Sequence, residues 1–166
     1  SLIADGDTIA IDAGTTTLSI AKYITAKEIT VLTNSVDVAY ELSKKRDVEV
    51  IVTGGTLRWE TRAMVGPVAD NTLKNFRVDK AFMGSNGVCI INGLTTPNII
   101  EASTKREMIR IAKQTILLCD HTKFGTVYFA KIVDLDSVDI IITDNQLDNE
   151  LLEKFEEKDI KIMTAK

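Results

Sequence analysis

The sequence is poor in side chains that hold metal ions or form disulfides. It contains one histidine, His121, and two cysteines, Cys89 and Cys119, among 166 residues. Zinc sites usually take about four ligands that include histidine or cysteine, so we expect no metal site and no metal-based catalysis. Both cysteines lie in apolar runs, which is typical of buried, reduced thiols in a cytoplasmic protein.

Long apolar runs and clusters of basic side chains are also missing. No run reaches the roughly 18 apolar residues of a membrane-spanning helix, and no signal peptide is recognised. The formal net charge is −4, and the lysines and arginines are dispersed along the chain. We therefore expect no membrane partner and no nucleic-acid binding by this chain itself. Because the sequence starts at Ser1 without methionine, we expect it to be a piece of a longer protein.

The common motifs of nucleotide-binding proteins and hydrolases are absent. No G-x-G-x-x-G follows the first expected strand, where residues 12–16 read Asp-Ala-Gly-Thr-Thr, and there is no Walker motif. No serine stands in a nucleophile-elbow pattern, and a catalytic triad would have to use His121. These classes of enzyme are weakly supported, and we expect no cofactor.

What the sequence does contain is a regular alternation of apolar strands and helical patterns. Strands are expected at residues 8–11, 30–32, 48–52, 80–83, 88–91, 115–119, 138–142 and 160–163. Helices are expected from 15 to about 24 and at 36–45, 68–76, 99–113 and 148–158, with 56–66 irregular and 94–97 a loop. This alternation predicts a single α/β domain over residues 1–166. Because the strands are nearly continuously apolar, the sheet is expected to be largely parallel and covered by helices on both faces.

Small polar clusters stand at the ends of six of these strands. The clusters are Asp12-Ala13-Gly14-Thr15, Thr33-Asn34, Thr53-Gly54-Gly55, Gly84-Ser85-Asn86-Gly87, Asp120–Lys123 and Thr143-Asp144. The carboxyl ends of parallel strands share one edge, where ligands of open α/β sheets bind. The hydroxyls, amides and few charges suit a small, hydroxylated and anionic ligand. The alternative is that each cluster is only a turn, because these residue types favour turns.

The first cluster is the best candidate for an anion site. Gly14, Thr15 and Thr16 join a strand directly to a helix, and the first N–H groups of a helix have no partner within it. Threonine hydroxyls would add donors, and Asp12 could orient this loop or accept a hydrogen bond from a sugar hydroxyl. The alternative is that Thr15 or Thr16 simply caps the helix.

Charged residues near the other strand ends could complete such a site. Glu101 and Lys105 lie four apart on a helix, so they either face the ligand or form an exposed pair worth about 0.2–0.5 kcal/mol. Lys123 and Asp120 follow a strand directly, which favours a role at the ligand edge over a solvated loop. A further set lies in the segment 56–66. Arg58 and Arg62 are either lid residues or solvated arginines, and Trp59 is a candidate lid or interface residue.

These motifs, taken in order, resemble one known family. The matching pieces are residues 11–17 (Ile-Asp-Ala-Gly-Thr-Thr-Thr), Thr33-Asn34, Thr53-Gly54-Gly55, Gly66-Pro67, 79–84, Gly93-Leu94-Thr95, Glu101 with 105–109, and 120–125. They resemble the effector-sensing domain of DeoR-family bacterial transcription regulators over nearly the whole chain. One departure is His121-Thr122, where many members have a serine before the lysine.

The resemblance implies a fold, an effector and partners. The fold would be that of ribose-5-phosphate isomerase, glucosamine-6-phosphate deaminase and CoA transferases. The effector would be a phosphorylated sugar or related metabolite, and the protein an oligomeric repressor, dimeric or larger. Operator DNA would be bound by a winged helix-turn-helix domain that normally precedes the sensor and is absent from this chain. Leu2, Ile3 and Trp59 are candidate interface residues.

The strand-end clusters and the resemblance together give one set of candidate residues. The candidate effector-binding residues are Asp12, Gly14, Thr15, Thr16, Thr33, Asn34, Gly54, Gly55, Ser85, Asn86, Gly87, Glu101, Lys105, Asp120 and Lys123. The alternative function is a sugar-phosphate isomerase or deaminase that uses Glu101 or Asp120 as its base, which requires a carboxylate within about 3 Å of the proton and a tuned pKa. The ordered regulator motifs favour the sensor, so we expect no catalytic residues.

Overall fold

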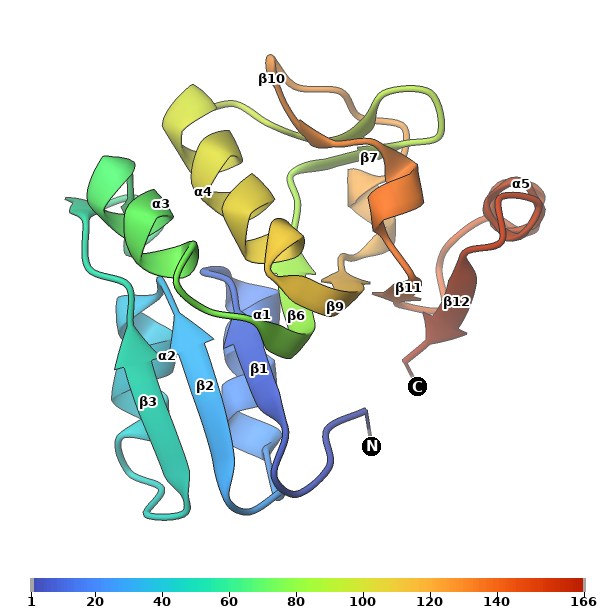
Figure 1. Cartoon of the computed structure of the whole chain (residues 1–166). Helices are drawn as coiled ribbons and strands as arrows, with labels where there is room; N and C mark the ends of the chain where they lie inside the picture. The colour runs from blue at the N-terminus through green and yellow to red at the C-terminus, as the bar shows by residue number, and fades with distance from the viewer. Residues whose placement is uncertain (1, 166) are drawn as a thin grey trace.

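A seven-stranded parallel sheet forms the centre of the protein, whose computed structural model describes residues 2–165 (Figure 1). The strand order is β12-β11-β9-β6-β1-β2-β3, and each neighbouring pair is parallel. The strands are β1 (Thr8–Ile11), β2 (Ile29–Thr33), β3 (Val48–Val52), β6 (Val78–Gly84), β9 (Ala112–Leu118), β11 (Ile140–Thr143) and β12 (Lys161–Thr164). The parallel sheet that the sequence predicts is confirmed.

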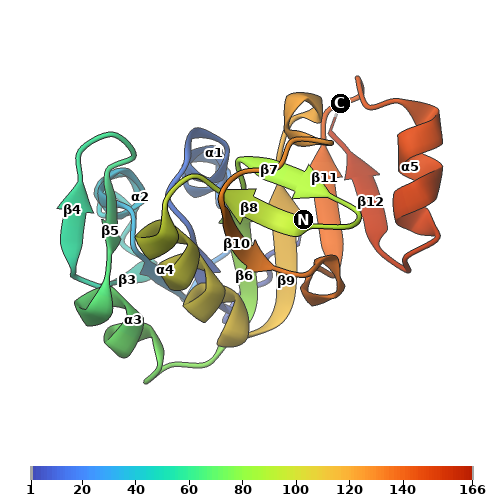
Figure 2. The same ribbon diagram turned by 90° about the horizontal axis from the view of Figure 1, so that it is seen from above.

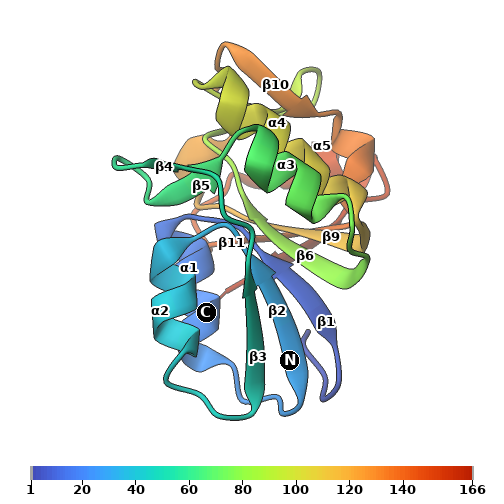
Figure 3. The same ribbon diagram turned by 60° about the vertical axis from the view of Figure 1, so that its left-hand side comes forward.

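Helices cover both faces of this sheet, as predicted. On one face lie α1 (Thr15–Tyr23) and α2 (Val36–Leu42), and on the other lie α3 (Pro67–Leu73), α4 (Ile99–Arg110) and α5 (Asn149–Glu156). Figure 3 shows α1 and α2 together on one side of the β1-β2-β3 strands, with α3 and α4 on the other. The fold therefore has three layers, with a hydrophobic core on each side of the sheet.

The alternation of side chains along the central strands supplies both cores. Ile9 and Ile11 of β1 belong to the cluster under α1 and α2, whereas Ala10 belongs to the cluster under α3 and α4. All three residues are fully buried. Successive side chains of a strand point to opposite faces, so a strand covered on both sides reads as continuously apolar. Leu2 and Ile3, the candidate interface residues, are partly buried and pack against the hydrophobic core under α1 and α2.

Two small antiparallel sheets lie beyond the main sheet (Figure 2), and of their strands the sequence predicts only the one expected at 88–91. The first contains β7 (Gly87–Cys89), β8 (Gly93–Thr96) and β10 (Ala130–Val133). The prediction of a loop at 94–97 is therefore wrong, and β10 was not predicted. Both strands are only four residues long, and pairing with one another rather than local pattern makes them strands.

The second small sheet is the hairpin of β4 (Thr56–Arg58) and β5 (Ala63–Val65), so the prediction that 56–66 is irregular is also wrong. Its strands are three residues long, too short to show a period of two. Ala63 and Val65 are each 3% exposed, whereas β4 stands out from the body of the protein. We call residues 56–65 the β4–β5 hairpin.

Several predicted helices end earlier than expected. The helix predicted at 99–113 ends at Arg110, since Ala112 already pairs with Val78 of β6. The Val78 N–H also donates to the carbonyl of Ile111 at 3.0 Å. Similarly, α2 ends at Leu42 rather than Lys45. Helix ends depend on such tertiary pairing, which sequence periodicity does not contain.

The winding of the chain reverses direction between β1 and β6. From β1 the chain adds β2 and β3 on one side, then returns and adds β6, β9, β11 and β12 on the other side of β1. Loops at the carboxyl ends of β1 and β6 therefore separate and leave a crevice between them. In open α/β sheets this switch point is where ligands bind.

Candidate functional site

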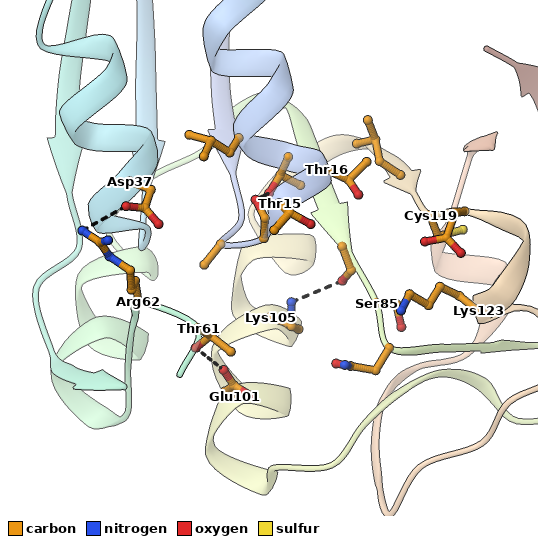
Figure 4. A pocket seen from close by; sticks show the side chains of 18 of the residues that line it. Thr15, Thr16, Asp37, Thr61, Arg62, Ser85, Glu101, Lys105, Cys119 and Lys123 are labelled. Carbon is orange, nitrogen blue, oxygen red and sulfur yellow. Dashed lines mark hydrogen bonds and ion pairs between the residues drawn. The ribbon is translucent and has the colours of Figure 1, made fainter. Parts of the chain in front are cut away.

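A cavity of about 350 Å³ opens at this switch point, at the carboxyl ends of β1, β6 and β9 (Figure 4). This volume falls within the roughly 300–1,000 Å³ of small-molecule sites. Of the predicted residues, the structure brings together on its wall Gly14, Thr15, Thr16, Ser85, Asn86, Glu101, Lys105, Asp120, Lys123 and Arg62. Most of the residues that line it are polar, as the sequence predicts.

The start of α1 presents unoccupied backbone donors to the cavity. The helix begins at Thr15 with Gly14 as its N-cap, and no side chain caps it. Thr15 and Thr16 are exposed on the cavity wall, so the alternative that one of them merely caps the helix is wrong. The Thr17 hydroxyl donates to the Gly14 carbonyl at 3.0 Å. The first N–H groups and the positive end of the helix dipole are therefore available to an anion.

Lys123 lies across the cavity from the start of α1 (Figure 4). It ends the short 3-10 helix η1 (His121–Lys123), which follows β9. Its ammonium group forms no hydrogen bond or ion pair with any residue from 2 to 165. At the start of η1 the Asp120 carboxylate accepts a hydrogen bond from the Thr122 N–H at 2.9 Å. A second bond from the Thr122 hydroxyl is the main cause that holds the pKa of Asp120 below its usual value.

Lys105, in contrast, is already paired. Its ammonium donates to the carboxylate of Asp12 and to the carbonyl of Gly84, the latter at 3.2 Å. Asp12 is 1% exposed and accepts a further bond from the Gly84 N–H at 3.1 Å. This arrangement joins β1, β6 and α4 at the floor of the cavity. Lys105 reaches the wall, but its charge is balanced by Asp12.

Glu101 occupies the end of the cavity under the β4–β5 hairpin. Its Oε1 accepts a hydrogen bond from the Thr61 hydroxyl at 2.9 Å and lies 3.6 Å from Nε of Arg58. Glu101 and Lys105 are both 9% exposed and contact different partners, so the alternative of an exposed i,i+4 pair is wrong. Nearby, Arg62 forms an ion pair of 3.1 Å with Asp37, and both line the cavity.

Thr33 and Asn34 lie behind the cavity rather than on its wall. Both are at most 2% exposed. The Thr33 hydroxyl donates to the Ile11 carbonyl at 2.6 Å. The Asn34 amide accepts from the Ala13 N–H at 3.2 Å and donates to the Met64 carbonyl at 3.2 Å. Asn34, Asp12, Glu101 and Lys105 also line a second cavity of about 10 Å³, which has room for about one water molecule.

Three predicted glycines stand away from the cavity wall and are needed for packing or for the backbone conformation. A Cβ at Gly55 would lie 2.7 Å from the Val65 carbonyl oxygen, and one at Gly87 would lie 2.3 Å from the Thr126 carbonyl oxygen. Gly54 has φ +68°, a conformation that favours glycine. Arg58, predicted as a lid residue, contacts Glu101 without lining the cavity.

The structure adds cavity residues that the sequence analysis missed, among them Asp37, Glu60, Thr61 and Cys119. Thr61 and Glu60 belong to the segment read as irregular, and Asp37 stands in the first turn of α2 as an ordinary helix-start residue. Burial raises the pKa of the Cys119 thiol to about 12, with further contributions from Asp120 and Asp144. This thiol therefore stays protonated and acts as part of the apolar floor.

One group of possible metal ligands exists among residues 2–165. The ligand atoms of Asp120, His121 and Asp144 lie within 4.8 Å of one another. Nδ1 of His121 lies 2.9 Å from the Asp144 carboxylate, which also accepts from the His121 N–H at 3.2 Å. His121 and Asp144 bond each other and Asp120 bonds Thr122, and partly exposed acidic clusters are common without an ion. Within the same residues no helix is long and apolar enough to cross a membrane.

Comparison with known proteins identifies the family. A family model described as the DeoR C terminal sensor domain matches residues 1–145. The HTH-type transcriptional regulator GlpR of Haloferax volcanii is 38% identical over 163 residues, covering 97% of this chain and 63% of that protein. The HTH-type transcriptional repressor GlcR of Bacillus subtilis is 39% identical over 157 residues, covering 93% and 60%. The chain thus spans less than two thirds of the length of these relatives.

Solved structures with the same fold are more distant. A D-ribose-5-phosphate isomerase in complex with phospho-erythronic acid superposes with a TM-score of 0.53 at 16% identity, over 74% of this chain and 48% of that one. The ribose 5-phosphate isomerase of Plasmodium falciparum gives 0.52 at 12% identity, over 76% and 48%. The predicted fold class is therefore confirmed.

Proposed function

This chain belongs to the family of DeoR C-terminal sensor domains, and we propose that its cavity binds a phosphorylated sugar or a related metabolite. The observation that carries the proposal is the position of Lys123, an unpaired cation facing the uncapped start of α1. Neutral N–H donors and a helix dipole favour an anion, and the lysine supplies the charge that a phosphate needs when it leaves water.

The opposite end of the cavity is suited to hydroxyl groups. Glu101 and Thr61 offer a carboxylate and a hydroxyl at that end. Between the two ends, Ser85 and Asn86 add polar groups to the wall from the end of β6. Asp12 and Lys105 hold the floor rigid by their mutual contact and leave the phosphate charge to Lys123. A molecule with a phosphate at one end and hydroxyls at the other matches this division.

We further propose that the chain is the effector-binding part of a longer cytoplasmic repressor. The relatives are named HTH-type transcriptional regulators, and about a third of their length lies outside the match. Operator DNA would be bound by a helix-turn-helix domain of the longer protein, because this chain carries a net charge of −4. The effector would change DNA binding through its different affinity for two states of a dimer or larger oligomer.

An isomerase or deaminase activity is the less favoured alternative. A general base works best when its pKa lies near the working pH. The pKa of Asp120 is lowered by its bonds from Thr122, away from that range. Glu101 is occupied at Oε1 by Thr61. The family, named for sensing, also favours a binding protein over an enzyme.

A thermal-shift screen tests the proposed function. Phosphorylated sugars such as glucose 6-phosphate, fructose 6-phosphate and ribose 5-phosphate would each be compared with the free sugar. A ligand at 100 times its Kd adds about 2.7 kcal/mol to the folded state, so binding is easily seen. We expect stabilisation by at least one phosphorylated sugar and little by its free form. Equal stabilisation by both, or turnover of an aldose or ketose phosphate well above the buffer rate, would contradict the proposal.

A further inference from the structure

We propose that the β4–β5 hairpin is a strap that a bound effector holds closed, and that Thr61 is the positioning residue that couples the strap to Glu101. This inference rests on the proposed function, because it concerns the same cavity. Figure 4 shows Thr61 and Arg62 reaching the cavity from the hairpin while Glu101 reaches it from α4.

The base of the strap is fixed to the body of the protein. The Met64 N–H donates to the carbonyl of Asn34 at 2.7 Å, and the Asn34 side chain returns a bond to the Met64 carbonyl. The same side chain accepts from the N–H of Ala13, next to the start of α1. Ala63 and Val65 are buried. The base therefore keeps its position relative to the proposed phosphate site.

The tip of the strap, residues 57–62, has no comparable anchoring. The side chain of Trp59 is 81% exposed, and Glu60, Thr61 and Arg62 are also exposed. Four polar contacts tie the tip to the rest of the protein: Thr61 to Glu101 at 2.9 Å, Arg58 to Glu101 at 3.6 Å, Arg62 to Asp37 at 3.1 Å, and Arg62 through its carbonyl to the Val36 N–H at 3.1 Å. Few buried contacts and exposed hydrogen bonds are the marks of a segment that opens at low cost.

The closed strap also carries an unpaired buried donor and an uncommon backbone conformation. Nε of Arg58 is buried without a hydrogen-bond partner, 3.6 Å from Oε1 of Glu101. Arg62 has φ +55°, the left-handed region that non-glycine residues rarely adopt. Unpaired buried donors and such backbone conformations persist only when other contacts compensate. A molecule that contacts Thr61 and Arg62 on the cavity wall would add such contacts to the closed strap.

The direction of the coupling follows from the cavity wall. Glu60, Thr61 and Arg62 line the same cavity as Thr15 and Lys123. A molecule that spans the cavity contacts the tip only when the strap is closed, so it binds the closed state more tightly than the open one. Coupling is reciprocal: the effector closes the strap, and a loosened strap weakens the effector.

The first arm of the test needs no ligand. Thr61→Val keeps the shape of the side chain and removes the hydroxyl, Thr61→Ser keeps the hydroxyl, and Thr72→Val removes a hydroxyl from α3, outside the strap. Hydrogen exchange of peptides covering 57–62 is measured for each. We expect faster exchange in Thr61→Val alone, confined to this segment and restored by serine. Unchanged exchange in Thr61→Val would overturn the role of Thr61.

The second arm adds ribose 5-phosphate and fructose 6-phosphate, with binding measured by calorimetry. Trp59, the only tryptophan of the chain, reports on the tip by its fluorescence anisotropy. We expect the bound sugar phosphate to slow exchange at 57–62 and to raise the anisotropy. Thr61→Val should weaken binding by up to about 10- to 150-fold, the range for one hydrogen bond to a charged group such as the Glu101 carboxylate.

The outcomes separate the two proposals. If a sugar phosphate binds but exchange and anisotropy stay constant, the strap is wrong and the proposed function stands. If Thr61→Ser binds as weakly as Thr61→Val, the hydroxyl is not the coupling group and the inference fails. If calorimetry detects no binding of any sugar phosphate in the thermal-shift screen, the proposed function is wrong. The strap that an effector holds closed is then wrong as well.

Discussion

The ammonium group of Lys105 is hydrogen-bonded to the carboxylate of Asp12 at the point where the sheet reverses its winding. Both groups are nearly buried, and the Gly84 backbone completes the contact with one donor and one acceptor. Two predicted ligand residues thus act on each other. Lys123 and the start of α1 still make one side of the cavity electropositive. We expect the Lys105–Asp12 pair to contribute mainly to the stability of the fold.

Removal of one partner of this pair should be costly. Lys105→Met leaves the Asp12 carboxylate buried without its cation, and breaking a buried pair typically costs about 3–5 kcal/mol. Urea unfolding, monitored by circular dichroism, measures the free energy of unfolding. Lys154→Ala, which removes an exposed lysine from an i,i+4 pair, is the control and should leave stability nearly unchanged. A loss in Lys105→Met no larger than in the control would contradict the structural role.

Asn34 should behave as a structural residue that links the start of α1 to the hairpin. Asn34→Ala leaves the Ala13 N–H and the Met64 carbonyl without their partner, at a cost of about 1–3 kcal/mol for each group that stays buried and unsatisfied. Chemical unfolding against Asn71→Ala, an exposed asparagine on α3, measures this loss. Unfolding free energies that are equal for the two variants would show that these bonds do not hold the loop.

The two cysteines should differ sharply in reactivity. Burial raises the pKa of Cys119 to about 12, so its thiolate is scarce at any ordinary pH. Cys89 is partly exposed, and hydrogen bonds from Asn92 and Ile91 outweigh its burial and lower its pKa. A thiol-disulfide reagent at pH 8 should modify Cys89 quickly and Cys119 only after unfolding. Two thiols reacting at one rate in the folded protein would contradict this assignment.

Acid should remove a stabilising contact at the opposite end of the sheet. Hydrogen bonds from Lys113, then from the Thr8 backbone and hydroxyl, lower the pKa of Asp79 well below its ordinary 3.8. A depressed carboxyl pKa stabilises the folded state above the unfolded pKa, and this contribution is lost as the pH falls toward the folded pKa. Unfolding free energies of wild type and Asp79→Asn should therefore differ at pH 7 and converge below pH 3.8. If the difference in unfolding free energy between wild type and Asp79→Asn grew as the pH fell, Asp79 would not have a lowered pKa in the folded state.

Much of the main sheet could be predicted because local pattern and tertiary structure agree there. Continuous apolar runs such as Ile9–Ile11 are typical of strands in a parallel sheet, and the small residues that follow them mark its carboxyl edge. That edge, together with the glycine and threonines at 14–16, was sufficient to place the cavity. Its polar wall follows from the same residues.

The hairpin and the pairing of charges could not be predicted, since both depend on contacts distant in sequence. The three residues of β4 form a strand only because Thr56–Arg58 pairs with Ala63–Val65. Lys105 meets Asp12 across 93 positions, and Thr61 meets Glu101 across 40. No spacing rule along the chain contains such partners, so a lysine available to a ligand and a lysine already paired look alike in sequence.

Calorimetry on wild type and Lys123→Ala, each with a sugar phosphate and with the matching free sugar, tests the central claim most directly. A charge-assisted hydrogen bond contributes about 1.5–3 kcal/mol, so the variant should lose about 10- to 150-fold in affinity for the phosphorylated ligand. Lys113→Ala, at the far end of β9, removes the same charge and should leave binding unchanged. The free sugar should bind weakly and be nearly indifferent to Lys123→Ala. If the free sugar and the sugar phosphate lose the same affinity, Lys123 does not recognise the phosphate and the proposed site is wrong.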